Sequence, residues 1–194
     1  MKHFSELSAS AERVVDAAEA LIHHHGYNGF SYDDVARKIG IKKPSIHHHF
    51  PSKAELVGVV AQRYTHRFRE QLLRIEGKHA KPLDRLKAYA ELFAQTYSQD
   101  RRLCVCGMLG AESEALPDDV AREVQRFFVI NLEWLSATFA SGQSDGSLRN
   151  SATPQDHAES FLCALEGAMV VGRGALMATG PATVARTFFS LVQT

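Results

Sequence analysis

The densest cluster of side chains that could contact a charged partner lies in residues 42–49. It begins with Lys42, Lys43, Pro44 and Ser45 and ends in three consecutive histidines. Ammonium and hydroxyl groups at the start of a short helix can donate hydrogen bonds to phosphates and to base edges in the major groove of DNA. These residue types therefore indicate nucleic acid as the partner, if one short helix presents them together.

Two short helices joined by a glycine turn are predicted around this cluster. The first opens at Ser31, with Asp34 in the position of a capping-box acid, and Gly40 ends it after about two turns. Its inner face is apolar: Val35, Ala36 and Ile39. The second runs from about Pro44 to Phe50, since proline suits a first helical turn. A helix this short can enter a major groove about 12 Å wide, so the pair is predicted to be a helix-turn-helix.

Helical periodicity continues through the rest of the chain. The pattern predicts an all-α fold of about nine helices, in which a three-helix N-terminal domain precedes a larger helical bundle. A first helix buries Val14, Val15, Ala18, Leu21 and Ile22 and stops at Gly26. The later helices are predicted to begin near Ser52, Pro82, Pro117, Pro154 and Pro181 and to end near Ile75, Gln99, Phe139, Gly180 and the C-terminus. Residues 141–147 are predicted to form a surface loop.

The composition fits a globular protein of the cytoplasm. Hydrophobic residues make up 45% of the chain, which is enough for a core, and no apolar run approaches the roughly 20 residues of a membrane helix. The first residues lack the apolar segment of a signal peptide. Three cysteines, an odd number, do not suggest a disulfide framework.

The net charge of zero hides a weak gradient along the chain. Residues 1–78 carry 12 Lys and Arg against 9 Asp and Glu, whereas residues 79–194 carry 10 against 13. Eight of the ten histidines also lie in the first part. The N-terminal part is therefore the better candidate for contact with a polyanion.

Residues 31–56 carry a recognisable pattern. Their sequence is Ser31-Tyr32-Asp33-Asp34-Val35-Ala36-Arg37-Lys38-Ile39-Gly40-Ile41-Lys42-Lys43-Pro44-Ser45-Ile46-His47-His48-His49-Phe50-Pro51-Ser52-Lys53-Ala54-Glu55-Leu56. This segment resembles the DNA-binding signature of TetR-family repressors. The shared pattern is a Ser/Thr cap, a Val-Ala step, a glycine turn, a recognition helix that ends in Phe, and Lys-x-x-Leu. The resemblance spans about residues 10–58. Beyond them it extends only to length and helical pattern.

The resemblance implies roles for individual residues. Ser31 and Lys53 would contact phosphates from the N-termini of two helices. Lys43, Ser45 and His48 would lie nearest the bases. Together with the flanking residues, the predicted DNA-binding set is Ser31, Lys42, Lys43, Pro44, Ser45, His47, His48 and Lys53.

Two histidines depart from the family pattern. His47 stands where the family usually has a phosphate-contacting tyrosine, and His49 replaces an aromatic residue that packs beneath the recognition helix. Imidazoles titrate near neutral pH, so the sequence suggests the hypothesis that DNA binding depends on pH.

Neither a metal site nor an enzyme is predicted. The histidine runs 23–25 and 47–49 do not converge on one ion, because adjacent residues on a helix point about 100° apart. His23–His25 instead fit the last turn of a helix. No nucleophile–base pair, phosphate-binding glycine loop or cofactor motif is visible, so we expect no catalytic residues and no cofactor.

The second part of the chain offers candidates for an effector site. Cys104 and Cys106 follow Arg101 and Arg102, which could lower the pKa of a thiol, so Cys104 is a candidate redox or electrophile sensor, as in a subgroup of the family. The alternative is that these thiols are small buried apolar groups, the reading favoured for Cys106 and Cys163. Candidate pocket residues are Phe93, Tyr97, Met108, Phe128, Trp134 and Phe161, although a stripe of apolar residues at helical spacing is more often plain core.

A dimer face is predicted near the C-terminus. Small residues recur in the helix from Pro154, and the last helix is apolar. The small set is Ala164, Gly167, Ala168, Gly172 and Ala175, and the apolar set is Val184, Phe188, Phe189, Leu191 and Val192. Two such helices from each of two chains would form a four-helix interface.

These observations predict a homodimeric DNA-binding repressor with two domains. Residues 1–55 would bind a palindromic operator, and residues 56–194 would bind a small-molecule effector and a second copy of the chain. The alternatives are release through modification of Cys104 and, more remotely, a helical adaptor that does not bind DNA.

Overall fold

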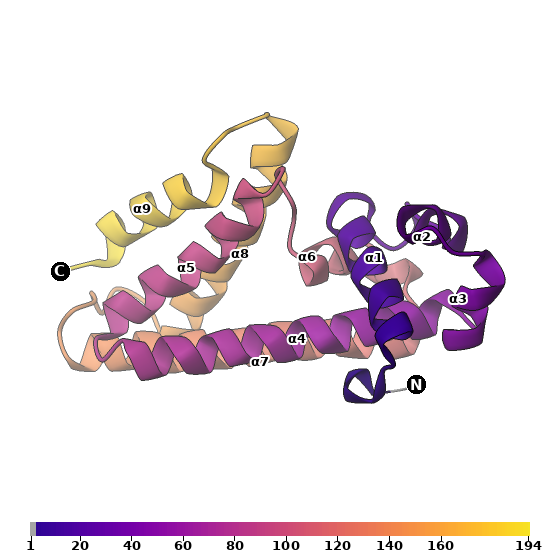
Figure 1. Ribbon diagram of the computed structural model, residues 1–194. Helices are drawn as coiled ribbons and strands as arrows, with labels where there is room; N and C mark the ends of the chain where they lie inside the picture. Colours follow the sequence, from indigo (N-terminus) through magenta and orange to yellow (C-terminus); the bar gives the residue numbers. More distant parts are fainter. Residues whose placement is uncertain (1–2) are drawn as a thin grey trace. The chain divides into compact units, whose positions relative to one another are not determined.

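The computed structural model describes residues 3–194, and nearly all of them are helical (Figure 1). Nine α-helices and two short 3-10 helices occur among these residues, which confirms the predicted all-α fold. In chain order they are η1 (Phe4–Glu6), α1 (Ala9–His25), α2 (Tyr32–Ile39), α3 (Lys43–His49), α4 (Lys53–Lys78), α5 (Pro82–Ser98), α6 (Val105–Gly110), η2 (Ser113–Ala115), α7 (Asp118–Ser144), α8 (Pro154–Gly174) and α9 (Gly180–Val192). A search of the described helices found none with the length and apolar character needed to span a bilayer.

The chain folds into two compact units that interleave along the sequence. The first unit comprises Met1–Phe68 and Val105–Phe127, and the second comprises Arg69–Cys104 and Phe128–Thr194. The chain passes from one unit to the other within α4, before α6 and within α7. The predicted boundary at residue 55 between a DNA-binding domain and a helical effector-binding and dimerisation domain stays a prediction.

In the first unit, α1, α2 and α3 pack against one another around a small apolar core (Figure 1). The buried side chains they contribute include Val14, Val15, Ala18, Ile22, Val35, Ala36 and Ile46, with Phe50 directly after α3. The predicted inner face of α1 is therefore confirmed, except that Leu21 is only half-buried. Ile39 at the end of α2 is also half-buried.

Local chemistry sets the ends of the short helices as expected. The carboxylate of Asp34 accepts hydrogen bonds from the backbone N–H of Ser31 at 2.8 Å and from its hydroxyl at 2.7 Å, which satisfies the entry to α2. Gly40 ends α2 in the left-handed region, with φ 69° and ψ 34°. At the entry to α4, the Glu55 N–H donates to the hydroxyl of Ser52 at 3.2 Å.

In the second unit, α5, α8 and α9 lie against one another (Figure 1). Tyr97 of α5 fixes the link between the other two helices, because its hydroxyl donates to the carbonyl of Met177 at 2.8 Å. The ring lies so close to Gly172 that a Cβ there would be 2.8 Å from the phenolic oxygen. Glycine is therefore required at this point of α8 for close approach.

Two predicted boundaries in the second unit are wrong. The loop expected over residues 141–147 begins later, because α7 continues to Ser144, where buried Gly142 packs closely against Leu148. The helix from Pro154 ends at Gly174 rather than at Gly180. Residues 175–179 are mostly good helix formers, so the sequence contains no signal that would end the helix there. The helix ends because Leu176 adopts φ 55° and because the Tyr97 hydroxyl donates to the carbonyl of Met177.

We expect Gly40→Ala to lower the free energy of unfolding by about 1 kcal/mol, because an L side chain is strained in the left-handed conformation. No atom lies within 4 Å of the position of the added Cβ, so backbone conformation alone would cause the loss. Urea unfolding of the full chain measures it. The matched control is Gly77→Ala in α4, also open around the Cβ but without positive φ, which should be neutral or stabilising by up to about 1 kcal/mol. Equal effects of the two substitutions would contradict this account.

Candidate nucleic-acid interface

Helix α3 presents a polar outer surface and an apolar inner one. The outer set, all exposed, is Lys42, Lys43, Pro44, Ser45, His47 and His48. Ile46 on the opposite side is fully buried, as is Phe50 just after the helix. Six of the eight predicted DNA-binding residues thus lie together on one exposed face, and burial of Ile46 and Phe50 holds that face outward.

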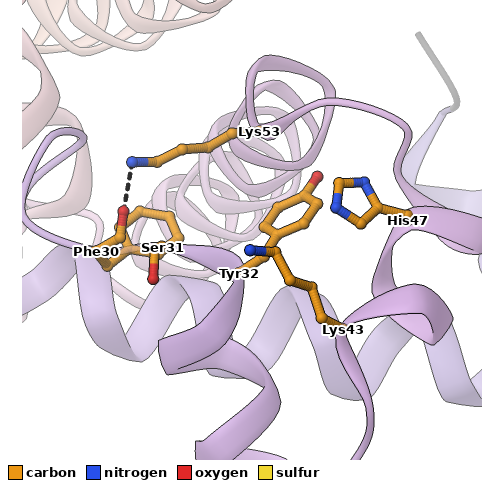
Figure 2. A pocket seen from close by; sticks show the side chains of 6 residues that line it. All are labelled: Phe30, Ser31, Tyr32, Lys43, His47 and Lys53. Atoms are coloured by element: carbon orange, nitrogen blue, oxygen red, sulfur yellow. Dashed lines mark hydrogen bonds between the residues drawn. The ribbon is translucent and has the colours of Figure 1, made fainter.

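Tyr32 at the start of α2 holds the far end of α3. Its hydroxyl donates to the carbonyl of Phe50 at 2.9 Å. The ring of His47 meets the ring of Tyr32 edge-on, with 4.8 Å between centroids (Figure 2). Burial raises the pKa of Tyr32, and the charge of Glu55 adds to the rise, so the phenol stays protonated and able to donate.

Lys53 is fixed at the entry to α4. Its ammonium group donates to the carbonyl of Phe30 at 2.5 Å, shown by the dashed line in Figure 2. The same nitrogen lies 4.4 Å from the centroid of the Phe30 ring and 4.7 Å from that of Tyr27. Partial burial lowers the pKa of Lys53, while the charges of Glu112 and Asp34 oppose that shift.

Lys43 forms an ion pair that the sequence did not reveal. Its Nζ lies 2.8 Å from Oδ2 of Asp33 in the first turn of α2. Both side chains are largely exposed, so the ion pair contributes about 0–1 kcal/mol to stability. Another anion can therefore replace Asp33 as the partner of Lys43. Asp33 thus positions Lys43 in the absence of a polyanion.

An open groove of about 340 Å³ lies between the starts of α2, α3 and α4 (Figure 2). Its lining is Phe30, Ser31, Tyr32, Lys43, His47 and Lys53. The structure thus brings together four of the predicted DNA-binding residues: Ser31, Lys43 and Lys53 from the starts of three helices, and His47 from the last turn of α3. Two ammonium groups and a hydroxyl around one groove can bind an anion such as a phosphate.

His49 points away from this groove. The side chain is half-buried, and its Nε2 lies 3.0 Å from the hydroxyl of Ser10 in α1. This is the inward placement that the resemblance implied for the aromatic residue at that position. His49 is therefore a packing residue of the three-helix domain.

The other histidine run ends α1 as predicted. His23 is buried and meets the ring of Tyr64 at 6.1 Å, and Gly26 follows the last turn with φ 68°. No group of three potential metal ligands occurs within residues 3–194.

Helix α1 is braced on α4 by an ion-pair network. Arg63 lies 2.7 Å from Asp16 and 2.9 Å from Glu19, and Arg67 pairs with the same glutamate. Glu19 and Arg63 are both mostly buried, so this network is less screened by solvent than the Lys43 pair. No feature of the sequence singled it out.

Glu112, which follows α6, holds the turn between α1 and α2. Its Oε2 accepts the backbone N–H groups of Tyr27 at 2.5 Å and Asn28 at 3.1 Å. A Cβ at Gly26 would lie 2.9 Å from Oε1, so glycine is needed there for both conformation and space. The contact joins residues about 85 positions apart, and no local sequence pattern could have predicted it.

The predicted effector residues divide between the two units. Phe93, Trp134 and Phe161 surround Tyr89 in the second unit, with ring centroids 5.4, 5.5 and 6.1 Å from it. Tyr97 and Phe128 lie in the same unit, whereas Cys106 and Met108 belong to α6 in the first unit. Sequence reasoning missed Tyr89, which is fully buried at the centre of the cluster.

The three cysteines differ in exposure. Cys104 and Cys106 are buried, with 2% and 0% of their surface accessible, and Cys163 is exposed. The packing role expected of Cys106 fits this burial, whereas Cys163 lies on the outside of α8. A sensing role for Cys104 stays a prediction.

Comparison with known proteins places this geometry in context. The sequence model described as "Bacterial regulatory proteins, tetR family" matches residues 14–60. A crystal structure of a TetR-family transcriptional regulator from Agrobacterium tumefaciens is 31% identical, with a TM-score of 0.92, and the alignment covers 96% of this chain and 98% of that one. The HTH-type transcriptional repressor DhaR of Mycobacterium sp. (strain GP1) is 24% identical over 82% of this chain and 80% of its own length. The transcriptional regulator AcuR of Cereibacter sphaeroides is 25% identical over 85% and 77%.

Removing the carboxylate of Glu112 should loosen the turn before α2. We expect Glu112→Ala to leave the N–H groups of Tyr27 and Asn28 without their acceptor, to speed hydrogen exchange at both amides, and to lower the free energy of unfolding by about 1–3 kcal/mol. The control is Glu114→Ala, an exposed glutamate two residues away, which should change neither quantity. Unchanged exchange at Tyr27 and Asn28 in the Glu112 variant would refute the assignment.

Proposed function

Because the chain belongs to the TetR family of bacterial transcriptional regulators, we propose that it acts as a homodimeric repressor of a pseudo-palindromic operator and leaves the DNA when a small molecule binds its second unit. It is a DNA-binding regulator with a helix-turn-helix. The operator contacts, the dimer and the trigger are the parts proposed here.

The exposed face of α3 is the observation that carries the DNA contacts. In the proposed complex this helix enters the major groove, where Lys43, Ser45 and His48 reach base edges. Ser31 and Lys53 hold phosphates on either side of it, from the helix starts that line the groove in Figure 2. Phosphate contacts then fix the register of α3, and the α3 side chains select the sequence.

A second copy of the chain covers the outer side of α8 in this proposal. Val170 and Val171 are 58% and 63% exposed, Leu191 of α9 is 66% exposed, and nothing lies within 4 Å of a Cβ added at Gly167. Large apolar side chains exposed on two helices that pack together are typical of a protein interface. In the proposed dimer the two α3 helices occupy successive major grooves of the operator, about 34–36 Å apart.

Some of the residues predicted for this interface instead pack within their own chain. Ala168 and Gly172 are buried within their own chain, as are Phe189 and Val192 of α9. The dimer face we propose is therefore narrower than the sequence suggested and centres on Val170 and Val171.

The trigger we propose is a small molecule bound in the second unit. To move an equilibrium from 1:99 to 99:1 it must prefer one state by about 5.5 kcal/mol, which a largely buried drug-sized ligand can supply. Modification of Cys104 stays the alternative. Its burial means that a reagent must first reach the interior of that unit.

Substitutions in the interface should separate affinity from specificity. We expect Lys53→Ala to weaken binding to all duplexes and to reduce the slope of log K against log salt by about 1, because one phosphate contact is lost. Lys43→Ala and Ser45→Ala should instead change the preferred sequence, at about 1–3 kcal/mol per lost base contact. Sequence selection from random duplexes, followed by gel shifts at two salt concentrations, measures both.

Lys87→Ala is the matched control, since this exposed lysine lies on α5 in the other unit. If the Lys43 and Ser45 variants retain wild-type affinity and preference, α3 does not read the operator. If the wild-type chain shows no salt-dependent binding to any duplex, a protein-binding helical adaptor becomes the better description.

Charging the outer side of α8 should break the dimer. We expect Val171→Asp to sediment as a monomer at micromolar concentration and to lose at least tenfold in operator affinity, because two carboxylates would be buried near the axis. Val129→Asp, on an equally apolar but separate position of α7 that is 44% exposed, should stay dimeric. A dimeric Val171 variant would show that another face mediates assembly.

A further inference from the structure

Glu166 of α8 carries a buried oxygen that nothing in the described chain satisfies. The residue as a whole is half-buried, but its Oε1 is shielded from solvent and has no hydrogen-bond partner within residues 3–194. The carboxylate accepts a hydrogen bond from the thiol of Cys104. A thiol is a weak donor, and a carboxylate can accept about four hydrogen bonds. The single bond from Cys104 therefore compensates little for the burial of Glu166.

The surroundings of Glu166 are aromatic rather than cationic. Burial raises the pKa of Tyr89, and the charges of Glu166 and Cys104 both act on it and add to the rise. The Tyr89 hydroxyl is engaged elsewhere, since it donates to Oδ1 of Asn131 at 2.7 Å. The Tyr89 ring stacks on Trp134 at 5.5 Å, with 18° between planes. Trp134 directs its N–H to Glu76.

No lysine or arginine of the described chain figures among the groups that act on Glu166. Burial raises its pKa to about 7, and the Cys104 hydrogen bond only partly opposes the rise. In the charged form, Oε1 is a buried acceptor without a donor. Buried polar groups left in this condition are rare in folded proteins, and they concentrate at functional sites.

We propose that Glu166 is the anchor of the effector site and that the effector is a small organic cation with at least one N–H group. The ammonium donates to Oε1 of Glu166, and the apolar part of the molecule packs against the aromatic cluster around Tyr89. This inference rests on the proposed function, because it names the class of molecule that the second unit binds. A cation supplies both what the carboxylate lacks, a donor and a compensating charge, and aromatic faces also favour it.

Matched probes of different charge test the class of ligand. Primary amines from butylamine to octylamine, with benzylamine, are compared with the alcohols and carboxylates of the same carbon skeletons, by thermal shift and calorimetry on the full chain at pH 8. We expect at least one amine to raise the melting temperature and to bind at least tenfold more tightly than its alcohol. The carboxylates should not bind.

Glu166→Gln should abolish the preference for the amine while leaving the affinity for the matched alcohol unchanged. The control is Glu159→Gln, which removes an exposed carboxylate from the same helix and should bind amines as the wild type does. A Cys104→Ser variant keeps a hydroxyl donor to Glu166 and should retain the amine preference, which separates this site from thiol modification.

The stability of the ligand-free protein gives a second readout. An acid with a raised folded-state pKa holds its proton longer in the native state, so wild-type stability should fall as pH rises from about 4.5 through about 7. Glu166→Gln should remove that part of the decline and be at least as stable as the wild type at pH 8. A purely structural carboxylate predicts the reverse, a less stable variant at every pH.

The inference is overturned if no amine in the panel is preferred over its alcohol, if Glu166→Gln keeps the preference, or if that variant is less stable than the wild type throughout. Gel shifts on the same variants distinguish this failure from failure of the repressor proposal. A wild-type protein that binds duplex DNA but not amines refutes the effector class alone.

Discussion

Helix α3, which we propose reads the DNA, has only seven residues, and this constraint governs the first unit. Isolated helices shorter than about 12–15 residues are marginal in water, so α3 depends on tertiary packing for its existence as well as its orientation. Ile46 and Phe50 supply that packing by complete burial, and the Tyr32 hydroxyl satisfies the carbonyl that follows the helix. The interface is therefore the outer surface of a small core, and any loss in that core is a loss of the interface.

The same dependence explains why the polar groups of the interface already have protein partners. Lys43 pairs with Asp33, the Ser31 hydroxyl donates to Asp34, and Lys53 donates to a carbonyl. Exposed pairs of this kind contribute little, so exchanging Asp33 for a phosphate costs little free energy. Lys53 differs, because burial lowers its pKa and a nearby phosphate would raise that pKa again. Its contribution to binding should thus be the more electrostatic of the two.

Local signals in the sequence predicted the helices that carry this face. Ser31, Gly40 and Pro44 each mark a helix end through the chemistry of a single residue, and the buried positions between them follow a helical repeat. The partners of those residues were not predictable. Glu112 reaches the turn after α1 from about 85 positions away, and Asp33 meets Lys43 only because α2 and α3 cross. Long-range contacts of this kind leave no periodicity.

The second unit was predicted less well for a related reason. Apolar spacing shows that Phe93, Trp134 and Phe161 are inside but not that they gather around Tyr89. Helix α7 ran past its predicted loop and α8 stopped early, since close packing at Gly142 and Tyr97 outweighs local propensity. On α8, Leu165, Ala168 and Met169 repeat as a buried face, and Glu166 adjoins that face rather than the solvent.

Placing one charged group beside an apolar face has a thermodynamic consequence. A ligand shifts a conformational equilibrium only by its difference in affinity between the two states. Apolar contacts are non-directional and change gradually with small movements, whereas a charge-assisted hydrogen bond in a dry site depends steeply on distance and angle. A few tenths of an ångström at Glu166 therefore discriminates between conformers better than the same movement at the aromatic rings. If Glu166 anchors the effector as we propose, the unsatisfied Oε1 would make the second unit responsive to its ligand.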